Sequence, residues 1–166
     1  IGFLRSEIPV ETRCDPAPYL RRPFQIDGNV VRARIYASAL GFGEIRLNGR
    51  KVGGDRERDP GFTDYSKRVP YVTYDVTSLI KDGTNVIGSI LGTGWYDVHE
   101  LAAWKFNEAP WRDRPKLRLM LVVDYDDGSS ETVSTDESWK CAAGPILYDG
   151  IYSGEVYDAR REMPGW

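Results

Sequence analysis

The sequence predicts an all-β domain, an antiparallel β-sandwich or barrel, and three observations support this prediction. Short segments alternate between apolar and polar residues, which is the period of a half-buried strand. Gly, Asn and Asp residues that favour turns separate these segments at short intervals. No stretch of ten or more residues has helical periodicity, and the best candidate, His99–Phe106, is short and leads into Pro110.

The strand-like pattern starts after a proline-containing lead-in. Residues 1–19 show little periodicity, so we expect them to be extended, followed by one β-sandwich domain over residues 20–166. The segment VVRARIYASA is the first clear strand. Its alternate apolar side chains are expected to face the core: Val31, Ala33, Ile35 and Ala37.

Two hairpins are expected. In GEIRLNGRKVGG the pair Asn48-Gly49 separates two alternating segments, and Asn-Gly suits a tight turn in which both central residues need positive φ. In KLRLMLVVDYDDGSSETVSTD the pair Asp127-Gly128 takes the same place.

The remaining elements are short. Val69–Val76 is rich in β-branched and aromatic residues and predicts a strand. Thr77 can cap a single helical turn that Gly83 ends. The mostly apolar segment 85–92 predicts a strand that is buried on both sides or nearly so, and residues 138–160 predict short strands separated by Gly-containing turns.

Composition excludes several classes of partner. The hydrophobic content of 41% is that of an ordinary globular protein. The net charge of −3 and the lack of Lys/Arg clusters predict no nucleic-acid partner and no anionic membrane surface. No apolar run approaches the roughly 18 residues that span a bilayer. The chain starts at Ile1 without a signal peptide and stops after a Pro-Gly turn, so we expect a fragment of a longer or processed chain.

No catalytic residue is assigned from the sequence. His99 is the only histidine, which argues against a His-based zinc site and weakens a Ser–His triad. Ser153 does not lie in a G-x-S-x-G elbow. Residues 92–97 lack the third small residue of a dinucleotide fingerprint and a following helix. Asp124–Glu131 lacks the spacing of an EF-hand, and we interpret it as a solvated hairpin turn.

The two cysteines, Cys14 and Cys141, fit no metal motif and are too few for a disulfide scaffold. We interpret them as two unpaired thiols. A single bridge between the chain ends is the alternative in an oxidising compartment.

Aromatic residues gather in a segment with loop character. In LGTGWYDVHELAAW, Trp95 and Tyr96 follow two glycines, and further aromatic residues lie in the irregular stretch 97–114: Trp104, Phe106 and Trp111. Such a cluster can stack on the apolar face of a sugar ring, or it can pack as a lid or against another domain. Both hypotheses stay open. Tyr74 and Trp139 fit ordinary core positions.

Several motifs in combination resemble a known family. They are LNG followed by VG, then PGFTDY, YDVT, GxNxxG and GWY, and finally YDGIYSGEVYDAR, within residues 31–166. Together they are similar to the N-terminal β-sandwich module of bacterial alpha-L-rhamnosidases. The resemblance implies a fold of the jelly-roll or galactose-binding-domain type, similar to carbohydrate-binding domains.

The resemblance also implies a function. Such modules precede an (α/α)₆ catalytic barrel that removes terminal L-rhamnose with inversion, and the catalytic carboxylates lie in the barrel. We therefore expect a non-catalytic accessory domain, whose partners are that catalytic domain and a rhamnose-containing glycan. The expected location is periplasmic or extracellular in a bacterium, with the cytoplasm as the alternative. A purely structural sandwich and a free-standing carbohydrate-binding module are the alternative functions.

The resemblance points to one candidate ligand site. Some family members bind rhamnose with help from calcium through an Asp-Asn pair in the GxNxxG segment. Here Asn85 matches, but Thr84 replaces the Asp and removes a hard oxygen ligand, which weakens the case for calcium. The candidate carbohydrate-binding residues are Thr84, Asn85, Trp95 and Tyr96. We expect Asn85 and the loop after Gly94 to share one end of the sandwich, which requires Gly92 and Gly94 to bend the chain.

Overall fold

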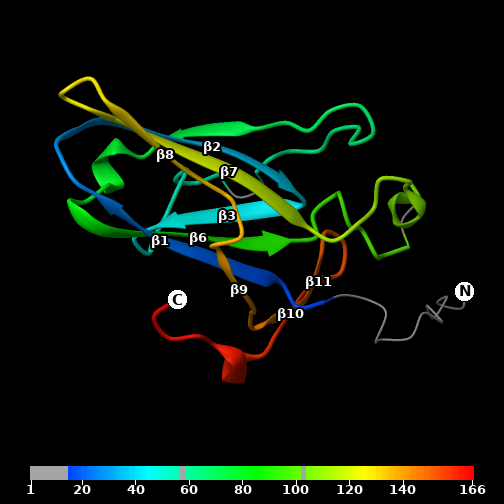
Figure 1. Cartoon of the computed structure of the whole chain (residues 1–166). Helices are drawn as coiled ribbons and strands as arrows, with labels where there is room; N and C mark the ends of the chain where they lie inside the picture. Colours follow the sequence, from blue (N-terminus) through cyan, green and yellow to red (C-terminus); the bar gives the residue numbers. More distant parts are fainter. Residues whose placement is uncertain (1–14, 57–58, 102–103) are drawn as a thin grey trace, which may run out of the picture.

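Two antiparallel sheets pack face to face in the computed structural model, which describes residues 15–56, 59–101 and 104–166 (Figure 1). One sheet has the strand order β4-β3-β6-β1-β9 and the other β5-β2-β7-β8, while β10 and β11 form a separate hairpin. This arrangement confirms the predicted antiparallel β-sandwich.

The bounds of the elements follow the predicted segments closely. In the described residues the strands are β1 (Pro18–Ile26), β2 (Val30–Leu40), β3 (Phe42–Leu47), β4 (Arg50–Lys51), β5 (Val72–Asp75), β6 (Gly83–Gly92), β7 (Lys116–Tyr125), β8 (Ser130–Ser134), β9 (Lys140–Ala143), β10 (Ile146–Gly150) and β11 (Gly154–Tyr157). The helical segments are short 3₁₀ turns: η2 (Thr77–Leu79), η3 (Phe106–Glu108) and η4 (Ala159–Arg161).

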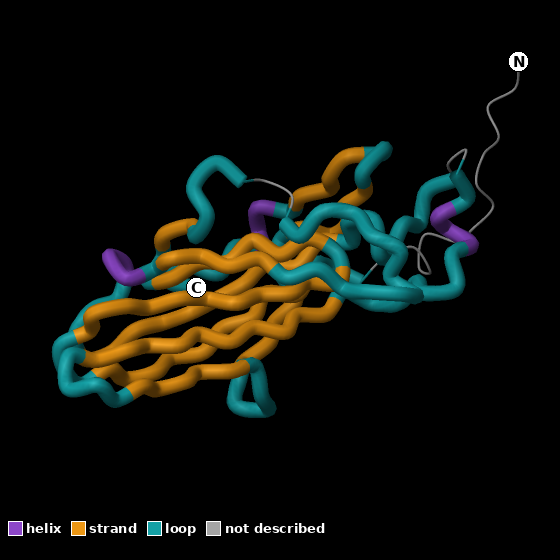
Figure 2. The backbone as a smooth tube through the Cα atoms, turned by 90° about the horizontal axis from the view of Figure 1, so that it is seen from above, coloured by secondary structure: helices purple, strands orange, loops and turns teal. Residues whose placement is uncertain are grey.

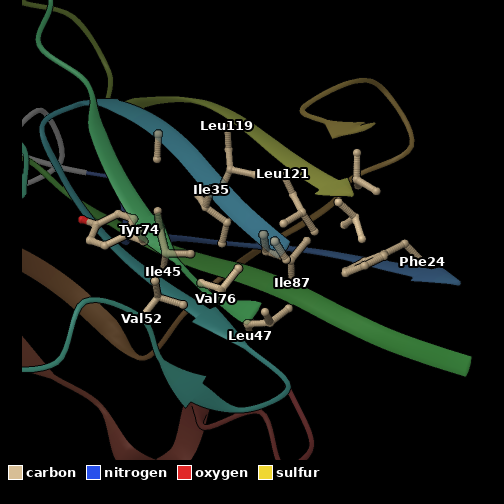
Figure 3. Close-up of a cluster of buried hydrophobic side chains, with 14 of the residues drawn as sticks. Phe24, Ile35, Ile45, Leu47, Val52, Tyr74, Val76, Ile87, Leu119 and Leu121 are labelled. Carbon is tan, nitrogen blue, oxygen red and sulfur yellow. The ribbon is translucent and has the colours of Figure 1, made fainter. Parts of the chain in front are cut away.

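The core lies between the two sheets and is lined by the inward-facing residues of both (Figure 3). Fully buried members include Ile35 on β2, Ile87 on β6 and Leu121 on β7. Because inward and outward residues alternate along each strand, the pattern of the sequence translates directly into this layer.

The alternation predicted for β2 is confirmed for Ala33, Ile35 and Ala37, which are buried. The prediction is wrong for Val31, which is 58% exposed. The pairing of β2 with β7 shifts between Val30 and Arg32, so Val31 is the extra residue of a β-bulge and turns away from the core.

Both hairpin predictions are confirmed, with different turns. Asn48 (φ 52°) and Gly49 (φ 79°) both have positive φ, as a two-residue turn between β3 and β4 requires. At the tip between β7 and β8 only Gly128 has positive φ (83°), and its N–H donates to the carbonyl of Tyr125. Asp127 instead accepts hydrogen bonds from Ser129, so the carboxylate-rich segment is a hairpin turn, as interpreted.

Strand β6 is central in its sheet, between β3 and β1. Its middle is buried on both faces, as predicted, because the Trp166 ring covers Gly88 from outside: a Cβ at Gly88 would lie 3.3 Å from that ring. Val86 differs from the prediction, since it is exposed on the outer face, as is Thr84 just before the predicted segment.

Strand β1 starts at Pro18, two residues before the expected domain start, and it tolerates Pro23 within a sheet. Strand β9 pairs only with residues Pro18 to Arg21 of β1, so Pro23 has no neighbouring strand on that side. A residue without an N–H donor costs no ladder hydrogen bond there.

The helical turn after β5 forms over η2, but Thr77 is not its cap. Val76 occupies the cap position, while the Thr77 hydroxyl accepts from the N–H of Ala33 and donates to Asp75. No helix among the described residues is long and apolar enough to cross a membrane.

The thiol of Cys141 is free and exposed on β9, and Cys14 lies outside the described residues. The long loop between β6 and β7 gathers with other loops at one end of the sandwich, opposite to η2 (Figures 1 and 2). This end, where β6 finishes, is called the loop end below.

Candidate functional site

The loop end is fixed where β6 finishes, at Thr93. Its backbone N–H and its hydroxyl lie 2.7 and 2.8 Å from Oδ1 of Asp149 on β10, which accepts from both. The strands approach closely here: a Cβ at Gly92 would lie 3.0 Å from Asp149 Oδ1. Gly94 has φ 52°, and a Cβ there would lie 2.9 Å from the Gly41 backbone. The two glycines therefore permit the turn and the close packing.

Asp149 is a partly buried carboxylate. Burial raises the pKa of Asp149 above its ordinary value, the hydrogen bonds from Thr93 oppose this shift, and the nearby carboxylates of Glu100 and Asp97 add to it. A carboxyl group with a raised pKa in a hollow end of the domain is a candidate ligand contact.

Three more polar side chains lie beyond Thr93. Arg112 Nε donates to Oδ1 of Asp97 at 3.2 Å, and Arg112 Nη2 lies 3.4 Å from Nδ1 of His99. The His99 Nε2 lies 3.1 Å from Oδ2 of Asp97, and this buried nitrogen has no hydrogen-bond partner in the described part of the chain.

These residues line a cavity of about 650 Å³, the end cavity. Leu91 lies among its apolar residues, and its polar lining consists of Asp15, Thr93, Asp97, His99, Arg112, Asp113, Arg114 and Asp149. The volume falls within the roughly 300–1,000 Å³ of pockets that bind small molecules.

The same loop sends aromatic side chains away from the cavity into an aromatic cluster. Its members are Phe62, Tyr65, Trp95, Tyr96, Phe106, Trp111 and Tyr152. Trp95 is central, with ring centroids 6.0 Å from Phe62, 5.4 Å from Phe106 and 5.9 Å from Tyr152.

Exposure differs strongly within the aromatic cluster. Tyr96 is buried, Trp95 is partly buried, and the outermost rings are Phe62 (51% exposed) and Tyr152 (54% exposed). The cluster thus begins in the interior of the loop end and reaches the surface. Trp104, named with this stretch in the sequence, is 76% exposed, and Trp139 packs against the core as expected.

Glu100 ties the β10–β11 hairpin to this loop. Its Oε1 accepts from the Ser153 hydroxyl at 2.7 Å and from the Tyr152 N–H at 3.4 Å. Burial alone would raise the pKa of Glu100, but these hydrogen bonds outweigh burial and lower it. Tyr152 is therefore held beside Trp95 by its own backbone.

Asn85 occupies a different place from the one expected. It is fully buried, and its amide makes four hydrogen bonds: to the carbonyls of Lys81 and Gly83, and from the Lys81 N–H and the Asn48 side chain. All of its side-chain hydrogen-bonding groups are therefore used within the domain. Thr84, the preceding residue, is exposed on the opposite face of the strand, so the two side chains diverge.

The expectation that Asn85 and the Trp95 loop share one end is wrong. Strand β6 runs without a break from Gly83 to Gly92, so the glycines turn the chain only after the strand ends. At about 3.3 Å per residue, Asn85 lies roughly 23 Å from Gly92. Figure 1 shows the two ends of β6 on opposite sides of the sandwich. The structure thus places Trp95 and Tyr96 in one aromatic cluster at the loop end, whereas Thr84 and Asn85 lie at the other end of β6.

The end cavity was not found from the sequence. Thr93 and Asp149 are 56 positions apart, and no motif joins them. Among the described residues no group of three or more His, Cys, Asp or Glu side chains is arranged to hold a metal ion.

The fold and the loop end define a class: an antiparallel β-sandwich that presents aromatic side chains and a polar cavity at one end. A family model described as the alpha-L-rhamnosidase N-terminal domain matches residues 28–166. The chain belongs to this family, which confirms the resemblance seen in its motifs.

Relatives agree in sequence and in structure. Alpha-L-rhamnosidases of Streptomyces avermitilis and Formosa agariphila are 44% and 37% identical over 90% and 98% of this chain. The crystal structure of the Streptomyces avermitilis alpha-L-rhamnosidase complexed with L-rhamnose superimposes with a TM-score of 0.84 at 43% identity over 91% of this chain. The structure of the native alpha-L-rhamnosidase from Aspergillus terreus superimposes with a TM-score of 0.86 at 39% identity over 96% of this chain. The similarity is therefore not confined to bacteria.

The chain spans only a small part of these proteins. It covers 14% and 17% of the two curated relatives and 14% and 18% of the two solved chains. Most of each relative therefore lies outside the region that matches.

Proposed function

We propose that this chain is a non-catalytic accessory domain of an alpha-L-rhamnosidase, and that it docks on the remainder of the enzyme through its aromatic cluster. Family membership and the small share of the relatives that it covers support the first part. The single observation that carries the second part is the half-exposed pair Phe62 and Tyr152, each of which is in ring contact with Trp95.

The packing of Trp95 favours docking over sugar stacking. Its neighbours Phe62, Phe106 and Tyr152 meet it edge-to-face, with interplanar angles of 71°, 64° and 80°. A stacking platform needs a free, flat ring face, whereas three rings already pack against this indole. Aromatic side chains that are partly buried in the free domain are the residues that interfaces favour at their centres.

The same reasoning assigns the glycosidase chemistry to the remainder of the enzyme. The relatives are alpha-L-rhamnosidases, and one was solved with L-rhamnose bound, so we propose a rhamnose-containing glycan as the substrate of the parent enzyme. In this proposal the domain supports the catalytic part, and its location is periplasmic or extracellular. A purely structural sandwich and a free-standing carbohydrate-binding module remain the competing functions.

A paired substitution in the enzyme that carries this domain tests the docking role. Phe62→Ser with Tyr152→Ser removes the two outermost rings, and Val31→Ser with Met120→Ser is the matched control, because these exposed apolar residues lie on β2 and β7. We expect the aromatic pair to split calorimetric unfolding into two transitions and to speed proteolysis between the domain and the remainder. The control pair should do neither.

The isolated 166-residue chain provides the second comparison. There the aromatic pair should unfold nearly as the unmodified chain does, since the two rings are half-exposed. Unchanged unfolding of the whole enzyme carrying the aromatic pair would refute docking through this cluster.

A further inference from the structure

The turn between β3 and β4 contains Asn48, the one asparagine of the chain that precedes a glycine. An Asn-Gly pair is prone to deamidation, because glycine has no side chain to shield its backbone nitrogen from the neighbouring side-chain amide. The turn lies beside η2, at the end of the sandwich opposite to the loop end (Figure 1). Chemistry at this turn is therefore separate from the aromatic cluster and from the end cavity.

We propose that Asn48 is a deamidation site that the folded domain closes and that unfolding opens. In the reaction, hydroxide removes the proton of the Gly49 N–H, and the Gly49 nitrogen attacks Cγ of Asn48. The bond between this nitrogen and Cγ forms, the Cγ–Nδ2 bond breaks, and the amide nitrogen leaves as ammonia after taking a proton from water. Water then opens the succinimide ring at either carbonyl, which leaves aspartate or isoaspartate at position 48.

Hydrogen bonds to both polar atoms of its side chain hold the Asn48 amide in place. Its Nδ2 donates to the carbonyl of Leu79 at 2.9 Å and to Oδ1 of Asn85 at 2.8 Å. Its Oδ1 accepts from the N–H of Val86 at 2.9 Å. Both N–H groups of the amide are therefore used. Attack by Gly49 requires the amide to swing toward the Gly49 nitrogen, and loss of ammonia removes the donor of the first two bonds.

The partners of this amide are themselves fixed. Asn85 is fully buried, and its remaining hydrogen-bonding groups are used by the backbone of Lys81 and Gly83. The Asn48 N–H donates to the Val86 carbonyl at 2.8 Å, so Asn48 and Val86 exchange two hydrogen bonds, one of them through the Asn48 side chain. This exchange extends the β3–β6 ladder beyond its last regular pair. Release of the Asn48 side chain therefore opens the end of the ladder.

Deamidation should also hinder the return to the fold. An aspartate at position 48 has no N–H group, so its carboxylate would face the Leu79 carbonyl and Oδ1 of Asn85 without a donor. Isoaspartate in addition inserts a methylene into the main chain of a tight turn, whose two residues have φ of 52° and 79°. A chain that stays unfolded is thus changed irreversibly, whereas the folded domain keeps Asn48 intact.

Mass spectrometry of the unmodified 166-residue chain tests the site. The chain is incubated in slightly alkaline buffer, folded in one sample and unfolded by guanidinium chloride in the other. Trypsin then releases residues 47–50 as one peptide. We expect deamidation of Asn48 to be at least about tenfold slower in the folded sample, since the reaction must pass through open forms. Asn29 and Asn107, which precede valine and glutamate, are internal references that should stay largely intact in both samples.

Two results of this comparison would overturn the proposal. Equal rates at Asn48 in the folded and unfolded samples would show that the fold does not close the site. An intact Asn48 in the unfolded sample would show that this asparagine is not a deamidation site.

A substitution in the strand that holds the amide tests the closure directly. Asn85→Ala removes an acceptor of the Asn48 Nδ2 and should speed deamidation of Asn48 in the folded chain about tenfold or more. Thr84→Ala, at the exposed neighbouring position, is the matched control and should leave the rate unchanged. No acceleration in a folded Asn85→Ala chain would contradict the role of these hydrogen bonds. If this variant does not fold, the comparison of the folded and unfolded samples decides.

The acid form of the site can be made by substitution. Asn48→Asp should lower the guanidinium chloride concentration at which half of the chain is unfolded. Asn107→Asp makes the same chemical change in the loop before β7, where no hydrogen bond of the side-chain amide is found in the described part of the chain, and should leave this midpoint unchanged. An unchanged midpoint for Asn48→Asp would refute the irreversible effect of deamidation on the fold.

Discussion

Asp149 on β10 accepts hydrogen bonds from both the N–H and the hydroxyl of Thr93, so two segments distant in sequence close the loop end of the sandwich. This link fixes the place where β6 finishes and the aromatic loop starts. It also places a carboxyl group in a partly buried position, which has a consequence for stability.

The stability contributed by Asp149 should depend on pH. Because burial raises its pKa in the folded state, the folded protein holds this proton more tightly than the unfolded chain does. The contribution is therefore present below the unfolded pKa of about 3.9 and is lost as the pH rises through the raised folded value. The free energy of unfolding of the unmodified chain minus that of Asp149→Asn should fall with increasing pH above about 4, measured by urea titration.

Asp75 is the control of opposite sign. Hydrogen bonds from Thr77 lower the pKa of Asp75, so its contribution is present at higher pH and is lost as the pH falls through the lowered value. The corresponding difference for Asp75→Asn should rise with pH. A difference for Asp149→Asn that is flat or rises would show that the carboxyl group is not perturbed as the structure indicates.

Trp95→Ala should destabilise the isolated chain by about 2–3 kcal/mol. Trp95 is partly buried among three rings, so the expected loss lies below the roughly 3–5 kcal/mol of a fully buried aromatic residue. Trp104→Ala, in the same loop but 76% exposed, should change stability by less than about 0.5 kcal/mol. Equal losses in chemical denaturation would mean that Trp95 does not pack as described.

Asn85→Ala should cost about 2–4 kcal/mol of stability. The substitution leaves the Lys81 N–H and the Asn48 side-chain amide without the partner that the Asn85 amide provides in two partly buried hydrogen bonds. Its exposed neighbour gives the control, and Thr84→Ala should lie within about 0.5 kcal/mol of the unmodified chain. If Asn85→Ala unfolds at the same denaturant concentration as the unmodified chain, the structural role of this amide is refuted.

Gly49→Val should destabilise the fold by about 1–2 kcal/mol, because a β-branched residue resists positive φ. No atom lies within 4 Å of the Cβ position at Gly49, so the cost comes from the backbone conformation (φ 79°) and not from a clash. Gly61 has equally open surroundings without a positive φ, and Gly61→Val should have a smaller effect. Thermal unfolding of both variants makes the comparison, and equal melting temperatures would argue against the turn.

The isolated chain should not hydrolyse an aryl rhamnoside. The matching region is only 14–17% of the curated relatives, and the proposed function assigns catalysis to the remainder. A chromogenic assay with the whole enzyme as positive control measures this. Hydrolysis by the purified chain that a single carboxylate substitution within it abolishes would overturn the assignment.

The sequence predicted most of the sandwich because local rules govern it. Alternation located β2 and β7, and Asn48-Gly49 located a hairpin through the φ values that only such residues adopt easily. The bulge at Val31 was missed, since one extra residue in a strand changes no local preference.

The candidate site was harder to predict because it depends on distant contacts. Whether Gly92 bends a strand or ends it is decided by packing against Asp149, and the sequence does not show that pair. The assignment of Asn85 to a shared end failed for this reason. The loop position of Trp95 and Tyr96 was predicted correctly, because the two glycines before them are a local signal.

The place of β1 in its sheet has a consequence for synthesis. This first strand pairs with β6 and β9, and Tyr19 faces Ile90 on one side and Ala142 on the other. At a ribosomal rate of about 5–20 residues per second, β9 is synthesised on the order of ten seconds after β1. A nascent strand with open edges invites pairing with other chains. Charged residues and proline discourage such pairing, and the middle of β1 contains Arg21, Arg22 and Pro23. These residues should therefore reduce intermolecular pairing of β1 until β6 and β9 pair with it.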